Sequence, residues 1–184
     1  MNHLPTDALA TRPTQPVYAF QACDLRYGID VHQIQEVSPC PPITPVPQAP
    51  PVVRGLTNMR SHIYLALDMR ALVGRAPAAI DAECRLVVIK PSITADLAII
   101  VERGGDIVHV RPNQIESPPP ALGKGAEPDL AAALFPRVYR MNDELMTIMD
   151  LAVIANVVQS HFAMTARGTG PTRGATYSSR EIIQ

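Results

Sequence analysis

The hydrophobic residues of this chain fall in short runs separated by turn-forming residues, a pattern typical of β-strands rather than long helices. The clearest run covers residues 63 to 67, where every second residue is a large aliphatic one and these share one face. Asp68 follows at the position of a helix N-cap, residues 69 to 73 are mostly apolar, and Gly74 is a natural stop. This segment predicts a half-buried strand that leads directly into a short helix.

The first strands are predicted near the N-terminus. Residues 17 to 23 and 27 to 31 are rich in aromatic and β-branched residues and flank a polar turn, so they predict a β-hairpin. Val31, Ile34 and Val37 then recur every three residues, which predicts a short helical turn after the second strand.

A proline-rich stretch separates this hairpin from the next strand. Residues 38 to 51 contain seven prolines, which remove backbone donors and exclude a central strand. We expect this stretch to cross the surface, held in place by Ile43 and Val46. Gly55 comes shortly after two β-branched valines and predicts a sharp backbone turn.

The second half of the chain repeats this organisation. Its predicted strands are residues 84 to 90, 97 to 102, 107 to 110, 138 to 141 and 145 to 149. Gly104 and Gly105 predict a turn before the third of these strands, and Asp150 predicts the cap of a helix from residue 151 to about 161. The order strand, aspartate and apolar helix thus occurs twice. It indicates two similar β-rich units and favours small barrels over a parallel α/β sheet.

The fold class predicted from these patterns is mainly β. Prolines and small residues without periodicity predict a flexible arm at residues 1 to 16, and glycines and arginines predict a flexible tail at 165 to 184. The domain between them covers 17 to 164. Its two units are predicted at about 17 to 75 and 84 to 161, joined by a linker of small residues.

Composition and charge narrow the possible partners. The chain has 184 residues, 47% of them hydrophobic, and a net charge of −1, which gives no reason to expect nucleic acid or an anionic membrane surface as a partner. The apolar runs are too short to span a bilayer and no secretory signal is visible, so we expect a soluble, cytoplasmic protein. Cys23, Cys40 and Cys84 are scattered without a close pair, which predicts reduced thiols.

The sequence offers no catalytic or metal-binding constellation. The five histidines are far apart, and none lies at metal-ligand spacing with a cysteine or carboxylate. The glycines of the predicted tail follow no strand, so a flexible linker is a better interpretation than a phosphate-binding loop. Glu102 and Asp106 are interpreted as solvated charges of a hairpin turn rather than an acid–base pair. We predict no enzyme activity, no metal and no cofactor.

Two polar residues, Glu36 and Arg60, occupy positions where packing of the core does not require them. Glu36 and Arg60 lie in segments whose other residues supply the core, and Arg60 follows the predicted Gly55 turn and Asn58, which can bond the local backbone. The planar guanidinium of Arg60 suits a partner's carboxylate or carbonyl oxygens. The alternatives are an arginine that is merely exposed and one that bonds the chain's own Glu36.

The stretches 27 to 37, 55 to 60 and 67 to 70 resemble the CheW family, the adaptors that couple chemoreceptors to the histidine kinase CheA. The resemblance covers roughly residues 17 to 161. It implies two SH3-like, five-stranded β-barrel subdomains with short helices, and a non-enzymatic role in a chemosensory array.

The resemblance also implies two contact surfaces. The residues it assigns to the cytoplasmic tip of the chemoreceptor are Ile34, Glu36, Gly55, Asn58 and Arg60. The candidates for contact with the regulatory domain of CheA, itself CheW-like, are Val87, Ile89, Ile99 and Val101. Other CheW-like domains are possible further partners.

Two positions differ from the family pattern. Ser61 stands where the family usually has glycine, and Leu65 where it usually has proline. These differences keep an auxiliary scaffold of a twitching-motility or other chemosensory-like pathway open as an alternative. Two further alternatives are an unrelated small-molecule-binding or enzymatic β-barrel and a structural module that only self-associates into rings.

Overall fold

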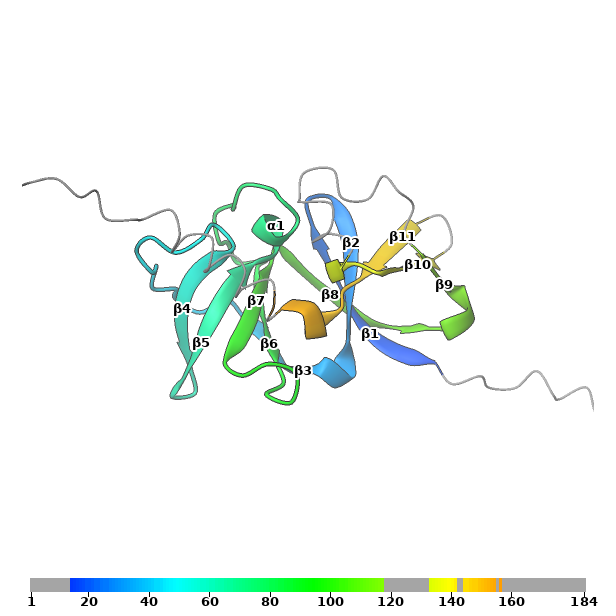
Figure 1. The fold of residues 1–184 in the computed structure, drawn as a ribbon, viewed down its shortest axis with the longest axis horizontal. Helices are drawn as coiled ribbons and strands as arrows, with labels where there is room; N and C mark the ends of the chain where they lie inside the picture. Colours follow the sequence, from blue (N-terminus) through cyan, green and yellow to red (C-terminus); the bar gives the residue numbers. More distant parts are fainter. Residues whose placement is uncertain (1–13, 118–132, 142–143, 155, 157–184) are drawn as a thin grey trace, which may run out of the picture.

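A computed structural model describes residues 14–117, 133–141, 144–154 and 156, which form two mixed β-sheets side by side (Figure 1). The six-stranded sheet has the order β8-β1-β2-β11-β10-β9 and consists of β1 (Gln15–Ala22), β2 (Leu25–Asp30), β8 (Arg103–Val110), β9 (Ile115–Glu116), β10 (Arg137–Met141) and β11 (Glu144–Ile148). The five-stranded sheet has the order β3-β6-β7-β5-β4 and consists of β3 (Ile34–Pro39), β4 (Val53–Met59), β5 (His62–Asp68), β6 (Arg85–Ile89) and β7 (Leu97–Val101). The short helical turns are η1 (Val31–Gln33), α1 (Met69–Leu72), η2 (Pro112–Gln114) and η3 (Leu151–Val153).

The prediction of a mainly β fold with two small β units and short helices is confirmed, but the predicted division along the chain is wrong. The units are not the successive segments 17 to 75 and 84 to 161. The six-stranded sheet takes the first two strands and the last four, because β1 pairs with β8 and β2 pairs in parallel with β11. The five-stranded sheet takes the strands between them. Periodicity within single strands carries no information about such long-range pairing.

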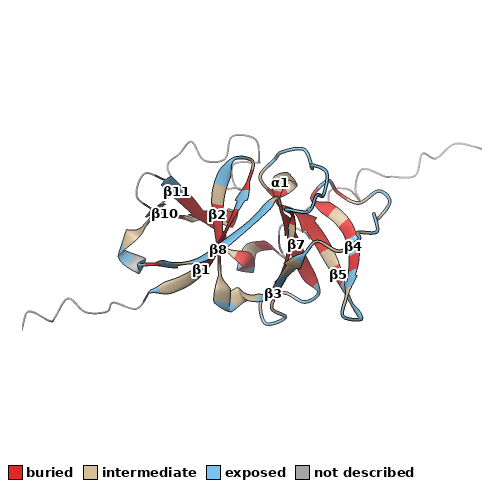
Figure 2. Ribbon diagram, turned by 180° about the vertical axis from the view of Figure 1, so that it is seen from behind, coloured by how far each residue is buried: buried red, intermediate tan, exposed pale blue. Residues whose placement is uncertain are grey.

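The buried apolar residues of the described chain form three clusters, one of which joins the two sheets. One cluster belongs to the six-stranded sheet and includes Val17 and Met146, and a second belongs to the five-stranded sheet and includes Leu86 and Val88. The largest cluster draws residues from both sheets, and the aromatic ring of Phe20 lies within it. Figure 2 shows these buried positions in red along the facing strands. Because the main core lies between the sheets, the two units share one core rather than forming two separate domains on a linker.

Two-residue turns close two of the hairpins. Cys23 and Asp24 join β1 to β2, and Arg60 and Ser61 join β4 to β5, all four with positive φ (51°, 62°, 52° and 65°). Positive φ at both central residues is the geometry of a type I′ turn, whose twist matches that of the flanking strands. The sharp turn predicted at Gly55 therefore lies five residues further on, at Arg60.

Gly55 itself lies inside β4. Its φ is +149°, and a Cβ there would overlap the carbonyl oxygen of Thr44 in the proline-rich segment. That segment lies directly on β4, since Thr44 and Leu56 exchange backbone hydrogen bonds of 2.7 and 2.8 Å. The residue is glycine because another backbone approaches it closely, not because the chain turns there.

We predict that Ser61→Gly stabilises the protein by about 0.5–1 kcal/mol, because serine at positive φ carries a steric cost that glycine avoids. The measurement is urea denaturation of both proteins. Ser92→Gly is the control, because Ser92 is also exposed but has no positive φ, so glycine there adds only freedom to the unfolded chain. Equal effects of the two substitutions would contradict the strain argument.

The predicted aspartate caps are confirmed. The Asp68 carboxylate accepts hydrogen bonds from the backbone N–H of Arg70 (2.9 Å) and Ala71 (3.2 Å) at the start of α1. The Asp150 carboxylate accepts one from Ala152 (3.0 Å) at the start of η3. Most of the helix predicted up to residue 161 lies outside the described residues.

Two other local predictions need correction. The three-residue spacing at Val31, Ile34 and Val37 reflects the 3₁₀ turn η1 followed directly by strand β3, and the Val37 side chain is exposed. Gly104 and Gly105 form no turn: they lie within β8, where a Cβ on Gly105 would overlap the Ala19 carbonyl oxygen of β1.

The ends of the chain can be compared only in part. The predicted arm extends to residue 16, but Gln15 and Pro16 already belong to β1. The rest of the arm, apart from residue 14, and the predicted tail lie outside the described residues. Among the described residues no helix is long and apolar enough to cross a membrane.

Candidate partner-binding surface

The five-stranded sheet curls so that its two edge strands, β3 and β4, meet. Arg60 donates a 2.8 Å hydrogen bond to the Glu36 carboxylate across this seam. Ser38 contacts the sulfur of Met59 at 3.3 Å, and Thr57 donates to the carbonyl oxygen of Pro42 at 3.0 Å. Because the sheet curls, Glu36 and Arg60 lie on one surface although they are 24 residues apart in sequence.

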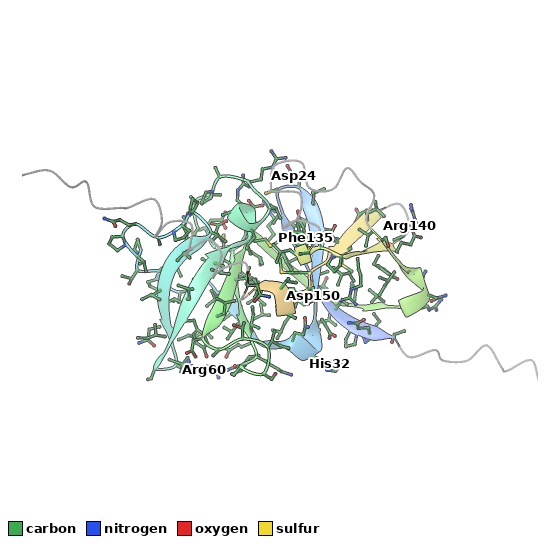
Figure 3. All side chains as sticks on the ribbon, viewed as in Figure 1. Asp24, His32, Arg60, Phe135, Arg140 and Asp150 are labelled. Atoms are coloured by element: carbon green, nitrogen blue, oxygen red, sulfur yellow. The ribbon has the colours of Figure 1, made fainter. Side chains whose placement is uncertain are left out.

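The Arg60–Glu36 ion pair lies at the tip of the β4–β5 hairpin, at the outer end of the five-stranded sheet (Figure 3). The Arg60 side chain is 79% exposed and that of Glu36 26% exposed. An ion pair this exposed contributes little to stability, about 0–1 kcal/mol. Most of the guanidinium fork therefore remains accessible to an acceptor on another molecule.

Apolar side chains accompany this ion pair. Asn58 stands opposite Ile63, and Leu56 opposite Leu65, on one face of the β4–β5 hairpin. Leu67 at the inner end of this face is buried and Leu65 half-buried, but Ile63 near the tip is 60% exposed and Leu56 is also exposed. We call Leu56, Asn58, Arg60 and Ile63 the hairpin surface. Exposed aliphatic groups around an arginine are the composition of a protein-contact site.

The structure places the receptor-contact candidates unevenly. Glu36, Asn58 and Arg60 lie together at or beside the hairpin surface. Gly55 is buried and contributes only the close approach of the proline-rich segment. Ile34, two residues before Glu36 at the start of β3, is half-buried and packs against the main core. Sequence reasoning missed Leu56 and assigned Ile63 to the half-buried strand, because nothing in the alternation shows where a hairpin extends beyond its neighbours.

The four kinase-contact candidates are wrong as surface residues. Val87, Ile89, Ile99 and Val101 each have 0% exposure and belong to the core between the two sheets. Their neighbours in β6 and β7 fill the second cluster, so both faces of these strands are covered and the apolar runs are continuous. These strands also share a sheet with β3 and β4, so they form no separate second face.

Glu102, interpreted from the sequence as a solvated turn charge, instead joins the two units. It lies between β7 and β8, where the chain crosses from one sheet to the other. Its carboxylate accepts a 2.7 Å hydrogen bond from the backbone N–H of Cys23, at the β1–β2 turn, and pairs with Arg70 of α1. The hydrogen bond that the Arg70 guanidinium donates to the Glu102 carboxylate raises the pKa of Arg70.

We expect Glu102→Ala to lower the free energy of unfolding by about 1 kcal/mol, since it removes the acceptor of two donors that are only partly exposed. Glu116→Ala is the matched control: that carboxylate is exposed, lies 3.8 Å from Arg140, and should cost less than about 0.5 kcal/mol. Chemical denaturation of both variants checks the difference. An equal loss in the two would show that Glu102 does not fasten the units.

No cluster of three or more His, Cys, Asp or Glu side chains that could hold a metal ion is present in the described part of the chain. His62 is exposed, forms a 2.6 Å hydrogen bond with Asp96 and packs against the ring of Tyr64, so these surface contacts account for it without a metal ion. The hairpin surface is the best-supported candidate site.

These features define a class: a mainly β module whose candidate site is an exposed surface with the composition of a protein contact. A family model described as the CheW-like domain matches residues 16–159. The chain therefore belongs to the CheW-like domain family.

Individual relatives agree with this assignment. The chain is 33% identical over 86 residues to Protein FrzA of Myxococcus xanthus, covering 46% of this chain and 54% of FrzA. It is 29% identical over 112 residues to the chemotaxis protein CheW of Treponema pallidum, covering 59% of this chain and 66% of that protein. The crystal structure of the scaffolding protein TtCheW from Thermoanaerobacter tengcongensis matches 83% of this chain and 93% of its own with a TM-score of 0.66 and 20% identity. This likeness supports the fold.

Proposed function

We propose that this chain is a non-enzymatic adaptor that couples chemoreceptors to a CheA-type histidine kinase in a chemosensory array. The observation that carries the proposal is the hairpin surface, an exposed arginine among exposed aliphatic side chains on a CheW-like domain. An adaptor needs a fixed relation between its contact surfaces. The core shared by the two sheets supplies that rigidity.

The receptor side of the proposal is the hairpin surface. Arg60 offers its fork to a carboxylate or to helix carbonyl oxygens of the receptor's cytoplasmic tip, while Ile63 and Leu56 supply apolar contact area. Glu36 orients the guanidinium in the free protein. The proposed location is the cytoplasm, with recruitment to membrane-associated receptor arrays.

The proposed contact with the kinase requires exposed residues, because the earlier candidates Val87, Ile89, Ile99 and Val101 are buried. Leu25 of β2 and Leu145 of β11 are both exposed, and the parallel register that pairs Arg26 with Met146 makes them neighbours. They lie in the six-stranded sheet, away from the β4–β5 hairpin. We propose this pair as the centre of the contact with the regulatory domain of CheA.

A second candidate function is an auxiliary scaffold in a twitching-motility or other chemosensory-like pathway. The likeness to FrzA, the relative with the highest of the identities given above, favours it. Ser61 and Leu65, which differ from the usual family residues, lie in the same hairpin that we assign to the receptor. They therefore bear on which receptor is recognised.

The test of the proposed function is isothermal titration of the purified chain with a CheA regulatory domain and, separately, with a receptor-tip fragment. We expect both to bind without added metal or nucleotide. Binding of neither, together with a bound small molecule or a turnover signal in the purified protein, would support the rival of a small-molecule or enzymatic β-barrel.

A further inference from the structure

Two cysteines that are distant in sequence stand opposite each other in the structure. The antiparallel ladder between β3 and β6 ends with Pro39 opposite Arg85, and extending this register by one residue brings Cys40 opposite Cys84. Directly opposed residues of an antiparallel pair have Cα atoms about 4.5–5.5 Å apart, which lies within the range a disulfide requires. Alternation along the strands puts both side chains on the same face as Leu86.

Burial places the two thiols in one environment. Cys84 is buried in the cluster of the five-stranded sheet, and Cys40 is partly buried and packs against that cluster. Burial raises the pKa of Cys40 to about 11, and the proximity of the Cys84 thiolate raises it too. Cys23 lies elsewhere, in the β1–β2 turn.

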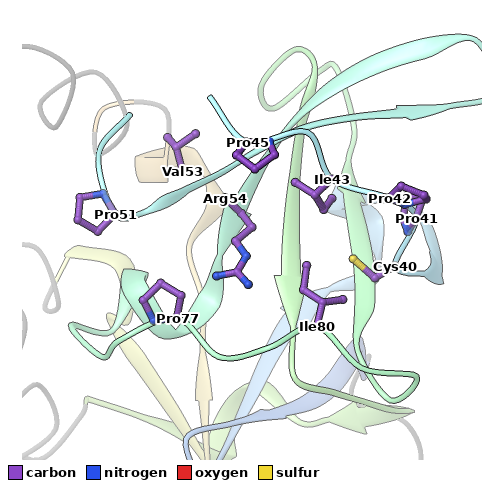
Figure 4. Close-up of a pocket in the computed structure, with 10 residues that line it drawn as sticks. All are labelled: Cys40, Pro41, Pro42, Ile43, Pro45, Pro51, Val53, Arg54, Pro77 and Ile80. Atoms are coloured by element: carbon purple, nitrogen blue, oxygen red, sulfur yellow. The ribbon is translucent and has the colours of Figure 1, made fainter. Parts of the chain in front are cut away.

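The two thiols differ in access. Cys40 lines an open pocket of about 600 Å³, with proline rings, Ile43, Ile80 and Arg54 around it (Figure 4). The Arg54 charge favours the thiolate of Cys40 and so acts against the effect of burial on its pKa. Cys84 does not line this pocket: it is buried, and its thiol contacts the Asp81 carboxylate at 3.4 Å. A small reagent can therefore reach Cys40 first.

We propose that Cys40 and Cys84 are a redox-active pair that closes to a disulfide, with Cys40 as the attacking thiol and Cys84 as the resolving one. The oxidant is a small disulfide such as oxidised glutathione. The Cys40 thiolate attacks one of its sulfur atoms and displaces one thiolate, which takes up the proton that Cys40 lost. The Cys84 sulfur then attacks the Cys40 sulfur of the mixed disulfide and displaces the second thiolate, which takes up the Cys84 proton. Two electrons and two protons pass to the small disulfide, and a dithiol reverses the reaction.

Closing this pair ties the start of the proline-rich segment to β6. The cross-linked loop contains β4, β5 and α1, and with them the hairpin surface. A loop of this length restricts the unfolded chain strongly, so oxidation should raise Tm by on the order of 10 °C if the bond forms without strain. The site does not depend on the adaptor role, because it rests on the strand register and the pocket alone.

The experiment treats the full chain and its Cys23→Ser variant with oxidised glutathione, followed by peptide mass spectrometry without reduction. We expect one intramolecular Cys40–Cys84 disulfide in both proteins, reversed by dithiothreitol. Cys84→Ser should trap glutathione on Cys40, whereas Cys40→Ser should form neither product at a comparable rate. Between pH 7 and 10 the initial rate should rise about tenfold per pH unit, because the pKa of Cys40 is about 11.

Three results would overturn the proposal. They are a disulfide that involves Cys23, cross-links only between molecules, and a glutathione adduct that persists on Cys40 in the full chain. Absence of any reaction at pH 9 while unfolded protein reacts fully would overturn it as well, since the pocket would then not admit the reagent.

Discussion

Val101→Asp is expected to unfold the protein. The Val101 side chain has no exposed surface and lies in the core that joins the two sheets. A carboxylate there has no partner and loses its hydration, a change in the class that destabilises by more than about 4 kcal/mol. The measurement is the urea midpoint, with circular dichroism to detect loss of the β signal. Ile99→Ala, which leaves a cavity rather than a charge, should cost about 2–5 kcal/mol.

Ile107→Asp is the control for this prediction. Ile107 is an aliphatic residue of β8 with 55% of its surface exposed, so aspartate there should leave the fold intact. A Val101→Asp protein that folds normally would contradict the description of the inter-sheet core. It would then restore Val101 as a candidate contact residue.

Arg60→Glu is expected to weaken receptor binding by at least about tenfold while the protein remains folded. The substitution removes the exposed guanidinium and places a second carboxylate beside Glu36. Loss of a charge-assisted contact should weaken binding by about 1.5–3 kcal/mol, roughly 10- to 150-fold, and like charges add to this. Titration of a receptor-tip fragment measures the effect, and binding of the kinase regulatory domain should be unchanged.

A charge swap separates a contact with the partner from a role in orientation. The double variant Glu36→Lys, Arg60→Glu can form the ion pair with reversed signs, so any stability lost in Arg60→Glu should return. Receptor binding should not return, since the cation then sits on β3 rather than at the hairpin tip. Full recovery of binding would show that only the ion pair matters and that Arg60 does not touch the receptor.

Local features of the fold followed from the sequence. Asp68 and Asp150 were recognisable because a short acceptor before apolar helical residues has one common role, that of a cap. The β1–β2 hairpin was recognisable because two strand-forming runs flank a polar turn. In the candidate site, the Arg60–Glu36 bond was among the alternatives left open, and the structure shows it.

Features that depend on pairing between distant strands did not follow from the sequence. The parallel pairing of β2 with β11 interleaves the units, and no periodicity within a strand encodes it. The burial of Val87 and Ile99 depends on the second sheet that covers them, since an apolar strand has the same sequence at a core and at an interface. The opposition of Cys40 and Cys84 appears only with the register of β3 and β6.

The glycines show the same limit. The sequence predicts turns at Gly55 and Gly105, because turns are the commonest use of glycine. In the structure each lies in a strand where a neighbouring backbone leaves no space for a Cβ. Whether a glycine serves a turn or a close backbone approach depends on a segment elsewhere in the chain. For Gly55 that segment contains Thr44, and for Gly105 it contains Ala19.

The central claim is that the chain joins receptor and kinase through different surfaces at the same time. The most direct measurement is a competition titration, in which the protein saturated with a CheA regulatory domain is titrated with a receptor-tip fragment and followed by analytical ultracentrifugation. The account predicts a ternary complex, with a receptor affinity within about threefold of that of the free protein. Displacement of the kinase domain by the receptor fragment, with each partner binding well alone, would contradict it.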